Sequence, residues 1–188
     1  MGPATTLTEL GAARFTAAID KMLAVYTAAM RPVPSQLAGR RSIMARHATY
    51  PNFRALAVLD DQGEPVAFSY GFHGETGQWW HDIVSYAVAA SSGAATAGEW
   101  LSDSFEVAEL HVLPAFQNQG LGRNLLFRLT ADRRERNAVL STHDSDSPAR
   151  HLYRSLGFVD LLTSFRFSGG DPLYAVMGAP LPLRGAPG

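Results

Sequence analysis

The stretch VLPAFQNQGLGRNLL, residues 112–126, decides the fold class. Gly120 and Gly122 stand one residue apart, where an apolar run typical of a strand gives way to a run typical of a helix. A helix N-terminus presents backbone N–H groups without intrahelical partners, together with the positive end of the helix dipole. Because glycines add no side-chain bulk, phosphate oxygens can reach these donors. A tight turn without a ligand explains the two glycines equally well, so both interpretations stay open at this point.

Two better-known glycine patterns do not fit. Leu125 stands where the dinucleotide-binding pattern G-x-G-x-x-G has its third glycine, and the loop lacks the lysine of an ATP-binding P-loop. The stretch AFSYG, 67–71, differs from the nucleophile elbow of serine hydrolases, because Ala67 replaces its first glycine and Ser69 lies inside an alternating strand. We therefore favour neither a nucleotide-binding fold nor a serine hydrolase.

A second informative stretch is DSPARHLYRSLGF, residues 146–158. Ser147 is a good N-cap, Pro148 fits the first turn of a helix, and Gly157 fits its end. The pattern predicts a helix over 147–158.

The two stretches together resemble the motifs of the GNAT family of N-acetyltransferases. In the first stretch, the family pattern Q/R-x-x-G-x-G/A is matched by Gln117, Gly120 and Gly122. In the second stretch, the matching residues are Ala149, Leu152, Tyr153, Gly157 and Phe158. Asn118 and Asp146 depart from the pattern, since the family often has glycine and asparagine there. The resemblance covers roughly residues 104–160 and implies an α/β fold with a mixed, mostly antiparallel central sheet flanked by helices.

The resemblance also implies acetyl-CoA as the acetyl donor. The backbone groups of Leu110 and Val112 are expected to pair with the pantetheine arm. Asp146 falls where the family's asparagine contacts that arm, although a carboxylate cannot donate a hydrogen bond as an amide does. The pyrophosphate is expected on the loop residues Gln117, Asn118, Gln119, Gly120, Leu121, Gly122 and Arg123.

Acetyl transfer to an amine benefits from a general base, because a lysine-like amine with a pKa of about 10.4 is almost fully protonated at pH 7. Alternation along the strand expected over 104–114 places Glu109 and His111 on one face with Phe105 and Val107. Glu109 is the predicted base, with a structural ion pair as the alternative role. His111 and a water molecule remain the other candidates for the base.

Tyr153 is the predicted general acid, because the matching tyrosine in many family members can protonate the departing thiolate. Packing in the core is the alternative role for its ring. The chain has no cysteine, which removes an acyl-cysteine intermediate and favours direct attack of the amine on the thioester.

The rest of the chain predicts one domain over 1–180 and a flexible tail over 181–188. The stretch 91–98 is predicted to be a surface loop. Trp79, Ile83 and Tyr86 are expected on one face of a helix over 78–90. Further helices are predicted over 12–30, 35–48 and from the glycine loop to about Arg136. Strands are predicted over 53–60, 65–73, 104–114, 137–142, 158–167 and 173–179.

The amino-acid composition argues against several classes of binding partner. A net charge of −1 gives no electrostatic case for nucleic acid or an anionic membrane, and no apolar run is long enough to span one. The absence of cysteine fits a cytoplasmic location, and the scattered histidines predict no metal site. The cluster Trp79, Trp80, His81 and Asp82 could line an acceptor pocket or fill a core.

We therefore predict an acetyl-CoA-dependent N-acetyltransferase acting on a primary amine of a small molecule or peptide. The alternatives are the same fold with a longer acyl-CoA, or a regulatory module that binds acyl-CoA without turnover. Family members are often dimers, so a homodimer stays open.

Overall fold

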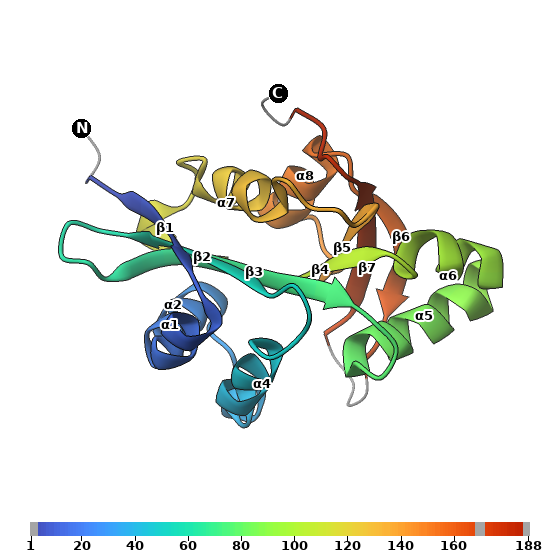
Figure 1. The fold of residues 1–188 in the computed structure, drawn as a ribbon, viewed down its shortest axis with the longest axis horizontal. Coiled ribbons are helices and arrows are strands. Elements are labelled where there is room, and N and C mark those ends of the chain that lie inside the picture. Colours follow the sequence, from blue (N-terminus) through green and yellow to red (C-terminus); the bar gives the residue numbers. More distant parts are fainter. Residues whose placement is uncertain (1–3, 168–171, 186–188) are drawn as a thin grey trace. The chain divides into compact units, whose positions relative to one another are not determined.

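The computed structural model describes residues 4–167 and 172–185. Its seven strands follow the order β1-β2-β3-β4-β5-β7-β6, with β4 and β5 parallel and the pairs β1–β2, β2–β3, β5–β7 and β6–β7 antiparallel (Figure 1). The predicted mixed, mostly antiparallel sheet is confirmed. The strands are β1 Thr6–Leu10, β2 Arg54–Leu59, β3 Pro65–Gly74, β4 Ser104–Val112, β5 Asn137–His143, β6 Val159–Phe165 and β7 Tyr174–Pro180.

Helices lie between these strands. They are α1 Ala12–Ala17, α2 Ile19–Met30, α3 Pro34–Leu37, α4 Arg40–His47, α5 Trp79–Ser92, α6 Ala94–Leu101, the short 3-10 helix Pro114–Phe116, α7 Leu121–Thr130 and α8 Pro148–Ser155. Figure 1 labels the longer ones.

The chain forms two compact units. Unit 1 contains Met1–Phe72 and Ala108–Leu129, and unit 2 contains His73–Val107 and Thr130–Gly188. Each unit has its own apolar core, so each is described by itself. The sequence-based expectation of one domain over 1–180 stays a prediction.

In unit 1, period-two alternation along the strands builds the core. Ala55 and Ala57 of β2 share a core with Phe68, Tyr70 and Phe72 of β3. Helices α1, α2 and α4 cover these residues through the buried side chains Phe15, Ile19, Met22, Val25, Tyr26 and Met44. In Figure 1, α7 lies on the opposite side of these strands from α1 and α2.

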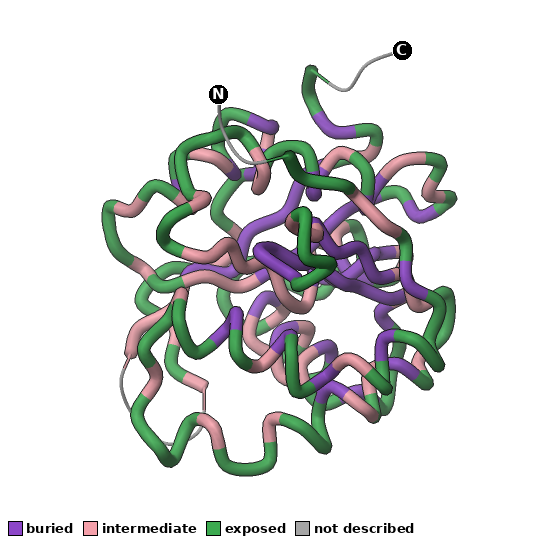
Figure 2. The backbone as a smooth tube through the Cα atoms, turned by 90° about the vertical axis from the view of Figure 1, so that its left-hand side faces the viewer, coloured by how far each residue is buried: buried purple, intermediate pink, exposed green. Residues whose placement is uncertain are grey.

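In unit 2, helices α5 and α6 pack on strands β5 and β7. The core combines Val84 and Val88 of α5 and Leu101 of α6 with Val139 of β5 and Val176 of β7. Figure 2 shows how buried stretches alternate with exposed loops and helix faces along the backbone.

Four sequence-based predictions of helices and loops are wrong. The helix expected over 35–48 is divided into α3 and α4 by Ala38 and Gly39. The stretch 91–98 is the end of α5 and the start of α6, because its alanines are strong helix formers and only Gly93, with φ +93°, interrupts the helix. The helix expected over 12–30 is divided at Ala18, and α7 ends at Thr130 instead of near Arg136.

The helix expected over 78–90 is present as α5, but the face that carries Trp79, Ile83 and Tyr86 is not its buried face. Trp79 and Tyr86 do lie on a common face, but they are 57% and 78% exposed. The buried face carries His81, Val84 and Val88. Hydrophobic spacing alone does not show which face of α5 packs against the sheet. In the structure the smaller valines, and not the large aromatic residues, fill that space.

The C-terminal stretch is attached to unit 2 as far as it is described. The N–H of Leu181 donates to the carbonyl of Arg136 at 2.8 Å, and the N–H of Arg184 donates to that of Leu156 at 3.1 Å. Leu183 is only 3% exposed. The tail expected over 181–188 is therefore held within 181–185, and residues 186–188 lie outside the described part.

Candidate active site

The loop between β4 and α7 has the backbone of an anion cradle. Asn118 and Gly120 both have positive φ, +60° and +80°. The carbonyl of Gly120 accepts the N–H of Asn124 at 3.0 Å, so α7 begins directly after this glycine. Left-handed residues in such a loop turn successive N–H groups toward one side, where they can bind an anion.

Gly120 owes its identity to backbone conformation and leaves open space in front of the loop. A Cβ built at this position meets no atom of the described chain within 4 Å, but the positive φ disfavours any side chain. Asn118 takes the second left-handed position, which asparagine tolerates better than most residues. The loop therefore combines helix N–H donors with room for a ligand.

Side chains and backbone fix this loop to the end of β4. The amide Nε2 of Gln117 donates to the carbonyl of Val112 at 3.0 Å, and that of Gln119 donates to the carbonyl of Ala115 at 3.1 Å. The N–H of Leu113 donates to Val66 of β3 at 2.8 Å. The predicted pyrophosphate-binding residues thus form one ordered turn.

Glu109, the predicted base, sits in an ionic cluster within unit 1. Its carboxylate accepts a 2.5 Å hydrogen bond from Nη1 of Arg40 and a short hydrogen bond from Nε2 of His111. The side chains of Glu109 and His111 are 14% and 10% exposed, whereas that of Arg40 is 26% exposed. The arginine is therefore the most solvent-accessible member of the cluster.

Aromatic rings enclose the same cluster. The guanidinium of Arg40 lies over the ring of Tyr26, 4.1 Å from its centroid. The ring of His111 meets Tyr26 edge-on at 5.0 Å and lies 5.5 Å from Phe68. Since Tyr26 and Phe68 are almost fully buried, the imidazole of His111 is held in a defined orientation.

The cluster keeps Glu109 ionised. Burial acts to raise the pKa of Glu109, but the hydrogen bond from His111 and the electrostatic interactions with His111 and Arg40 outweigh it and hold the pKa below its ordinary value. A carboxylate with a lowered pKa is a weak proton acceptor and a strong partner for a cation. This geometry makes Glu109 better suited to orient His111 than to take the proton itself.

A second histidine lies behind the cluster. Nδ1 of His47 is 3.0 Å from the hydroxyl of Tyr70. Burial lowers the pKa of His47 to about 4, although the negative charge of Glu109 partly opposes this. His47 is therefore neutral at pH 7.

Ser69, which had raised the question of a nucleophile elbow, lies inside β3 and is fully buried. Its hydroxyl donates to the backbone carbonyl of Glu109 at 2.7 Å. The serine thus has a structural role beneath the cluster, and the rejection of a serine hydrolase is consistent with this position.

The remaining predicted site residues belong to unit 2. Asp146 is 85% exposed at its side chain and pairs with His151 at 2.8 Å. Tyr153 of α8 is 7% exposed, and its ring centroid lies 5.7 Å from that of Phe158. The predicted N-cap is confirmed, because the side chain of Ser147 accepts the N–H of Arg150 at 3.3 Å.

The cluster at residues 79–82 does not form one pocket. The indole of Trp80 donates to Ser141 at 3.1 Å and packs on the core of unit 2, while Trp79 is exposed. His81 is 8% exposed and its Nε2 contacts the carbonyl of Leu101 at 3.1 Å. Of the two roles left open for this cluster, packing against a core is therefore the one found for Trp80.

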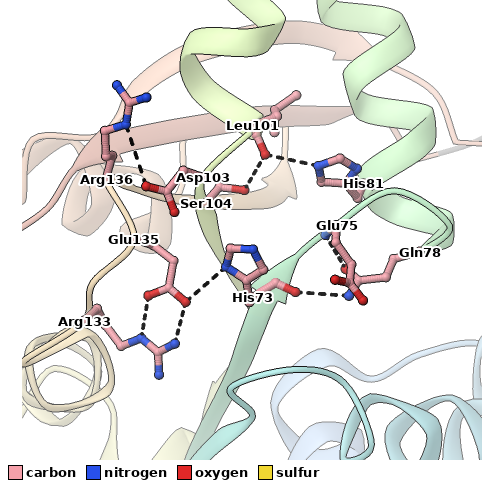
Figure 3. A network of polar contacts seen from close by, with 10 residues as sticks. All are labelled: His73, Glu75, Gln78, His81, Leu101, Asp103, Ser104, Arg133, Glu135 and Arg136. Carbon is pink, nitrogen blue, oxygen red and sulfur yellow. Dashed lines mark hydrogen bonds and ion pairs between the residues drawn. The ribbon is translucent and has the colours of Figure 1, made fainter.

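Unit 2 contains a second cluster of the same composition, drawn in Figure 3. The carboxylate of Glu135 accepts two hydrogen bonds from Arg133, at 3.0 and 2.6 Å, and lies 3.3 Å from Nδ1 of His73. The guanidinium of Arg133 lies 4.2 Å from the ring centroid of Phe105. The side chain of Glu135 is 3% exposed.

Sequence reasoning missed Arg40, Tyr26 and His47. These residues lie on α2 and α4, and Arg40 is 69 positions from Glu109 in sequence. The one available signal was a carboxylate on an otherwise apolar strand face, which requires a buried partner that the sequence does not identify.

Two general properties complete the description. Within residues 4–167 and 172–185, no group of three His, Asp or Glu side chains is arranged to hold a metal ion. Among the described helices, none is both long and apolar enough to cross a membrane.

Comparison with known proteins shows the family to which this chain belongs. Residues 52–160, more than half of the chain, match the family described as the acetyltransferase (GNAT) domain. The chain is 40% identical over 122 residues to the GCN5-like protein acetyltransferase Rv2170 of Mycobacterium tuberculosis, and the match covers 63% of this chain but only 59% of that relative.

Solved structures share the fold. The ribosomal-protein-S18-alanine N-acetyltransferase of Escherichia coli aligns with a TM-score of 0.63 at 18% identity, covering 95% of this chain and 94% of the other. A GNAT acetyltransferase of Staphylococcus aureus aligns with a TM-score of 0.64 at 10% identity over 95% and 99% of the two chains. A chain of the NatC complex bound to Gag peptide and CoA aligns with a TM-score of 0.62 at 13% identity, covering 94% of this chain and 98% of the other.

Proposed function

We propose, from the premise that this chain belongs to the GNAT family of acetyltransferases, that it transfers the acetyl group of acetyl-CoA to a primary amine by direct attack. One observation carries the proposal. The loop before α7 combines two left-handed residues, a helix N-terminus and open space in front of Gly120. These features suit a pyrophosphate.

Residues of unit 1 supply the donor site in this proposal. The pyrophosphate of acetyl-CoA binds the backbone N–H groups of the loop Gln117–Gly122, with Arg123 beside them. The backbone groups of Leu110 and Val112 pair with the pantetheine arm, as the resemblance implies. Asp146 of unit 2 remains a proposed contact to that arm.

The reaction forms the bond between the amine nitrogen and the carbonyl carbon and breaks the bond between that carbon and sulfur. A protonated amine loses two protons overall: one, lost as the amide forms, balances the proton gained by the CoA thiolate, and the other must leave before the nitrogen can attack. We assign this proton to the pair Glu109 and His111, with His111 as the acceptor and Glu109 as the carboxylate that orients and stabilises the imidazolium. A histidine accepts a proton near neutral pH, while the contacts of Glu109 with Arg40 and His111 keep its carboxylate ionised. Tyr153 is the proposed donor of a proton to the leaving thiolate.

A protein amine is the acceptor that the relative favours. The Mycobacterium tuberculosis relative is named a protein acetyltransferase, and this chain matches about three fifths of its length. A small-molecule amine stays the second choice. Neither choice changes the steps assigned to Glu109, His111 and Tyr153.

The proposal is tested by calorimetric titration of acetyl-CoA into matched glycine variants. Gly120 and Gly63 have the same conformation, with φ +80° and +78°, and both face open space within the described chain. Alanine at either position costs roughly 1–2 kcal/mol of stability because of the positive φ. Only Gly120→Ala is expected to weaken acetyl-CoA binding, by about tenfold or more, or ~1.4 kcal/mol. Equal binding by the two variants would contradict the proposed pyrophosphate site.

A second measurement distinguishes the proposed enzyme from a regulatory module that binds acyl-CoA without turnover. Release of free CoA thiol in the presence of amines reports catalysis directly. The double variant Glu109→Gln, Tyr153→Phe is expected to bind acetyl-CoA and release no thiol above background. Undiminished turnover would remove the proposed roles of both residues.

A further inference from the structure

The side chains of Tyr26, Glu109 and His111 form a box suited to a cation, and Arg40 fills it. The carboxylate of Glu109 and the ring face of Tyr26 contact the guanidinium of Arg40, and the imidazole of His111 contacts both Glu109 and Tyr26. A buried carboxylate and a ring face both attract cations strongly where water is largely excluded. The same features would bind a protonated amine.

Arg40 occupies the open side of the box. Its side chain is 26% exposed, compared with 14% for Glu109 and 10% for His111. A cation arriving from solvent therefore meets the guanidinium before the carboxylate. Displacing Arg40 breaks its contacts with Glu109 and Tyr26 and the 3.4 Å hydrogen bond from its Nε to the carbonyl of Gln36. Met44, which is 1% exposed, anchors α4 in the core independently of Arg40.

The backbone near Arg40 is held in place by contacts that do not involve the Arg40 side chain. Arg40 is the first residue of α4 and follows Gly39, whose φ is +77°. Its neighbour Arg41 forms an exposed ion pair with Asp20 of α2 at 3.0 Å. The start of α4 is thus tied to α2 without Arg40.

We propose that the box of Tyr26, Glu109 and His111 receives the cationic amine group of the acceptor, and that Arg40 occupies the box until the acceptor displaces it. The inference rests on the proposed function and adds the position at which the acceptor's ammonium binds. Binding beside His111 places the ammonium next to the group assigned to take its proton. Arg40 then acts as an internal competitor that excludes weakly bound cations.

The test uses n-butylammonium as the probe and n-butanol as its neutral control. Removing the internal competitor raises apparent affinity in proportion to the time for which the box was closed. A box closed for about nine tenths of the time or more predicts that Arg40→Gln binds n-butylammonium about tenfold tighter than the wild type. Arg41→Gln is the matched control and is expected to bind as the wild type does. The double variant Arg40→Gln, Glu109→Gln is expected to lose the gain.

A spectroscopic measurement covers the case in which Arg40→Gln does not fold. The Nε–Hε signal of Arg40 in the wild-type protein, assigned with Arg40→Lys, is expected to shift on addition of n-butylammonium and not of n-butanol. A signal that stays in place while the amine binds would overturn the inference. Arg40→Gln binding no tighter than the wild type, or a gain that persists in the double variant, would overturn it as well.

Acetyl-CoA binding, measured on the same samples, separates this inference from the proposed function. Loss of acetyl-CoA binding by the wild type would refute the proposed function. Normal binding and turnover of acetyl-CoA together with unchanged amine affinity in Arg40→Gln would refute the box alone.

Discussion

Glu109 in unit 1 and Glu135 in unit 2 are carboxylates with the same kinds of partner, one arginine and one histidine. The arginine partner of Glu135 is local, since Arg133 is two residues away and makes two hydrogen bonds to it, while His73 is 62 residues away. The arginine of Glu109 comes from another helix and makes one 2.5 Å contact. In the Glu135 cluster the arginine is 12% exposed and the histidine 27%, whereas in the Glu109 cluster the arginine is 26% exposed and the histidine 10%.

The comparison shows that composition does not decide what such a cluster does. Arg133 makes two hydrogen bonds to the same carboxylate and packs on the ring of Phe105. Arg40 makes one hydrogen bond to Glu109, a longer one of 3.4 Å to the carbonyl of Gln36, and packs on the ring of Tyr26. The histidine of the Glu109 cluster is enclosed by aromatic rings, and its arginine faces solvent. We therefore expect a structural role for Glu135, and the contrast supports the chemical role proposed for Glu109.

The largest effect is expected when the chemical role is removed. Glu109→Gln should lower kcat by about 10²–10⁴-fold, the usual range for losing assisted proton transfer. Glu135→Gln, the matched variant, should leave kcat within about twofold of the wild type. Thiol release measured at saturating acetyl-CoA checks both. Similar losses of kcat in the two variants would contradict the different roles expected for Glu109 and Glu135.

A lower free energy of unfolding is expected when the buried ion pair of unit 2 is broken. Glu135→Gln is expected to lower the free energy of unfolding by about 3 kcal/mol, because it leaves the buried charge of Arg133 without its counter-ion. Burial acts to raise the pKa of Glu135, but the hydrogen bonds from Arg133 outweigh it and hold the pKa below its ordinary value. The advantage of the wild type is therefore present above pH 4.5 and shrinks as the pH falls further. Urea unfolding across this range measures it, and an advantage that grows on acidification would contradict the assignment.

His47 adds a pH dependence at higher pH. In the unfolded chain a histidine titrates near pH 6.5, while burial keeps the pKa of His47 at about 4 in the folded protein. The unfolded state thus binds more protons, and stability is lost as the pH falls below 6.5. We expect His47 to account for a loss of roughly 2 kcal/mol between pH 6.5 and pH 5.

The comparison for this effect is His47→Gln, which keeps a polar group near Tyr70 and cannot titrate. Its unfolding free energy should be flatter over the same interval. A wild-type curve with the same slope as that of the variant would show that His47 is not held neutral.

The smallest effect is expected at an exposed ion pair. Lys21 and Glu64 are 2.7 Å apart, and their side chains are 56% and 55% exposed. Lys21→Ala should change the free energy of unfolding by less than about 1 kcal/mol, because solvent and salt screen such pairs. Thermal unfolding provides the measurement, and a larger loss would show that exposure is a poor guide to the value of these ion pairs.

Much of the fold followed from local patterns. The hairpin of β2 and β3, the strand before the glycine loop, and the capped helix α8 lie where alternation and turn residues predict them. The sequence-based predictions failed where tertiary packing selects between conformations that the local sequence favours equally. Ala94, Ala95 and Ala97 belong to α6, and the buried face of α5 is formed by His81, Val84 and Val88 instead of by Trp79 and Tyr86.

The sequence by itself determined the family, the sheet, the glycine loop and the pairing of Glu109 with His111 on one strand face. These features depend on residues close together in the chain, where backbone geometry fixes spacing and direction. Only the tertiary structure decided that Arg40 pairs with Glu109, that Tyr26 packs on Arg40 and His111, and that burial keeps His47 neutral. Such contacts join segments far apart in the chain, 69 positions for Arg40 and Glu109, and burial, which sets their charges and pKa values, arises only when those segments pack together.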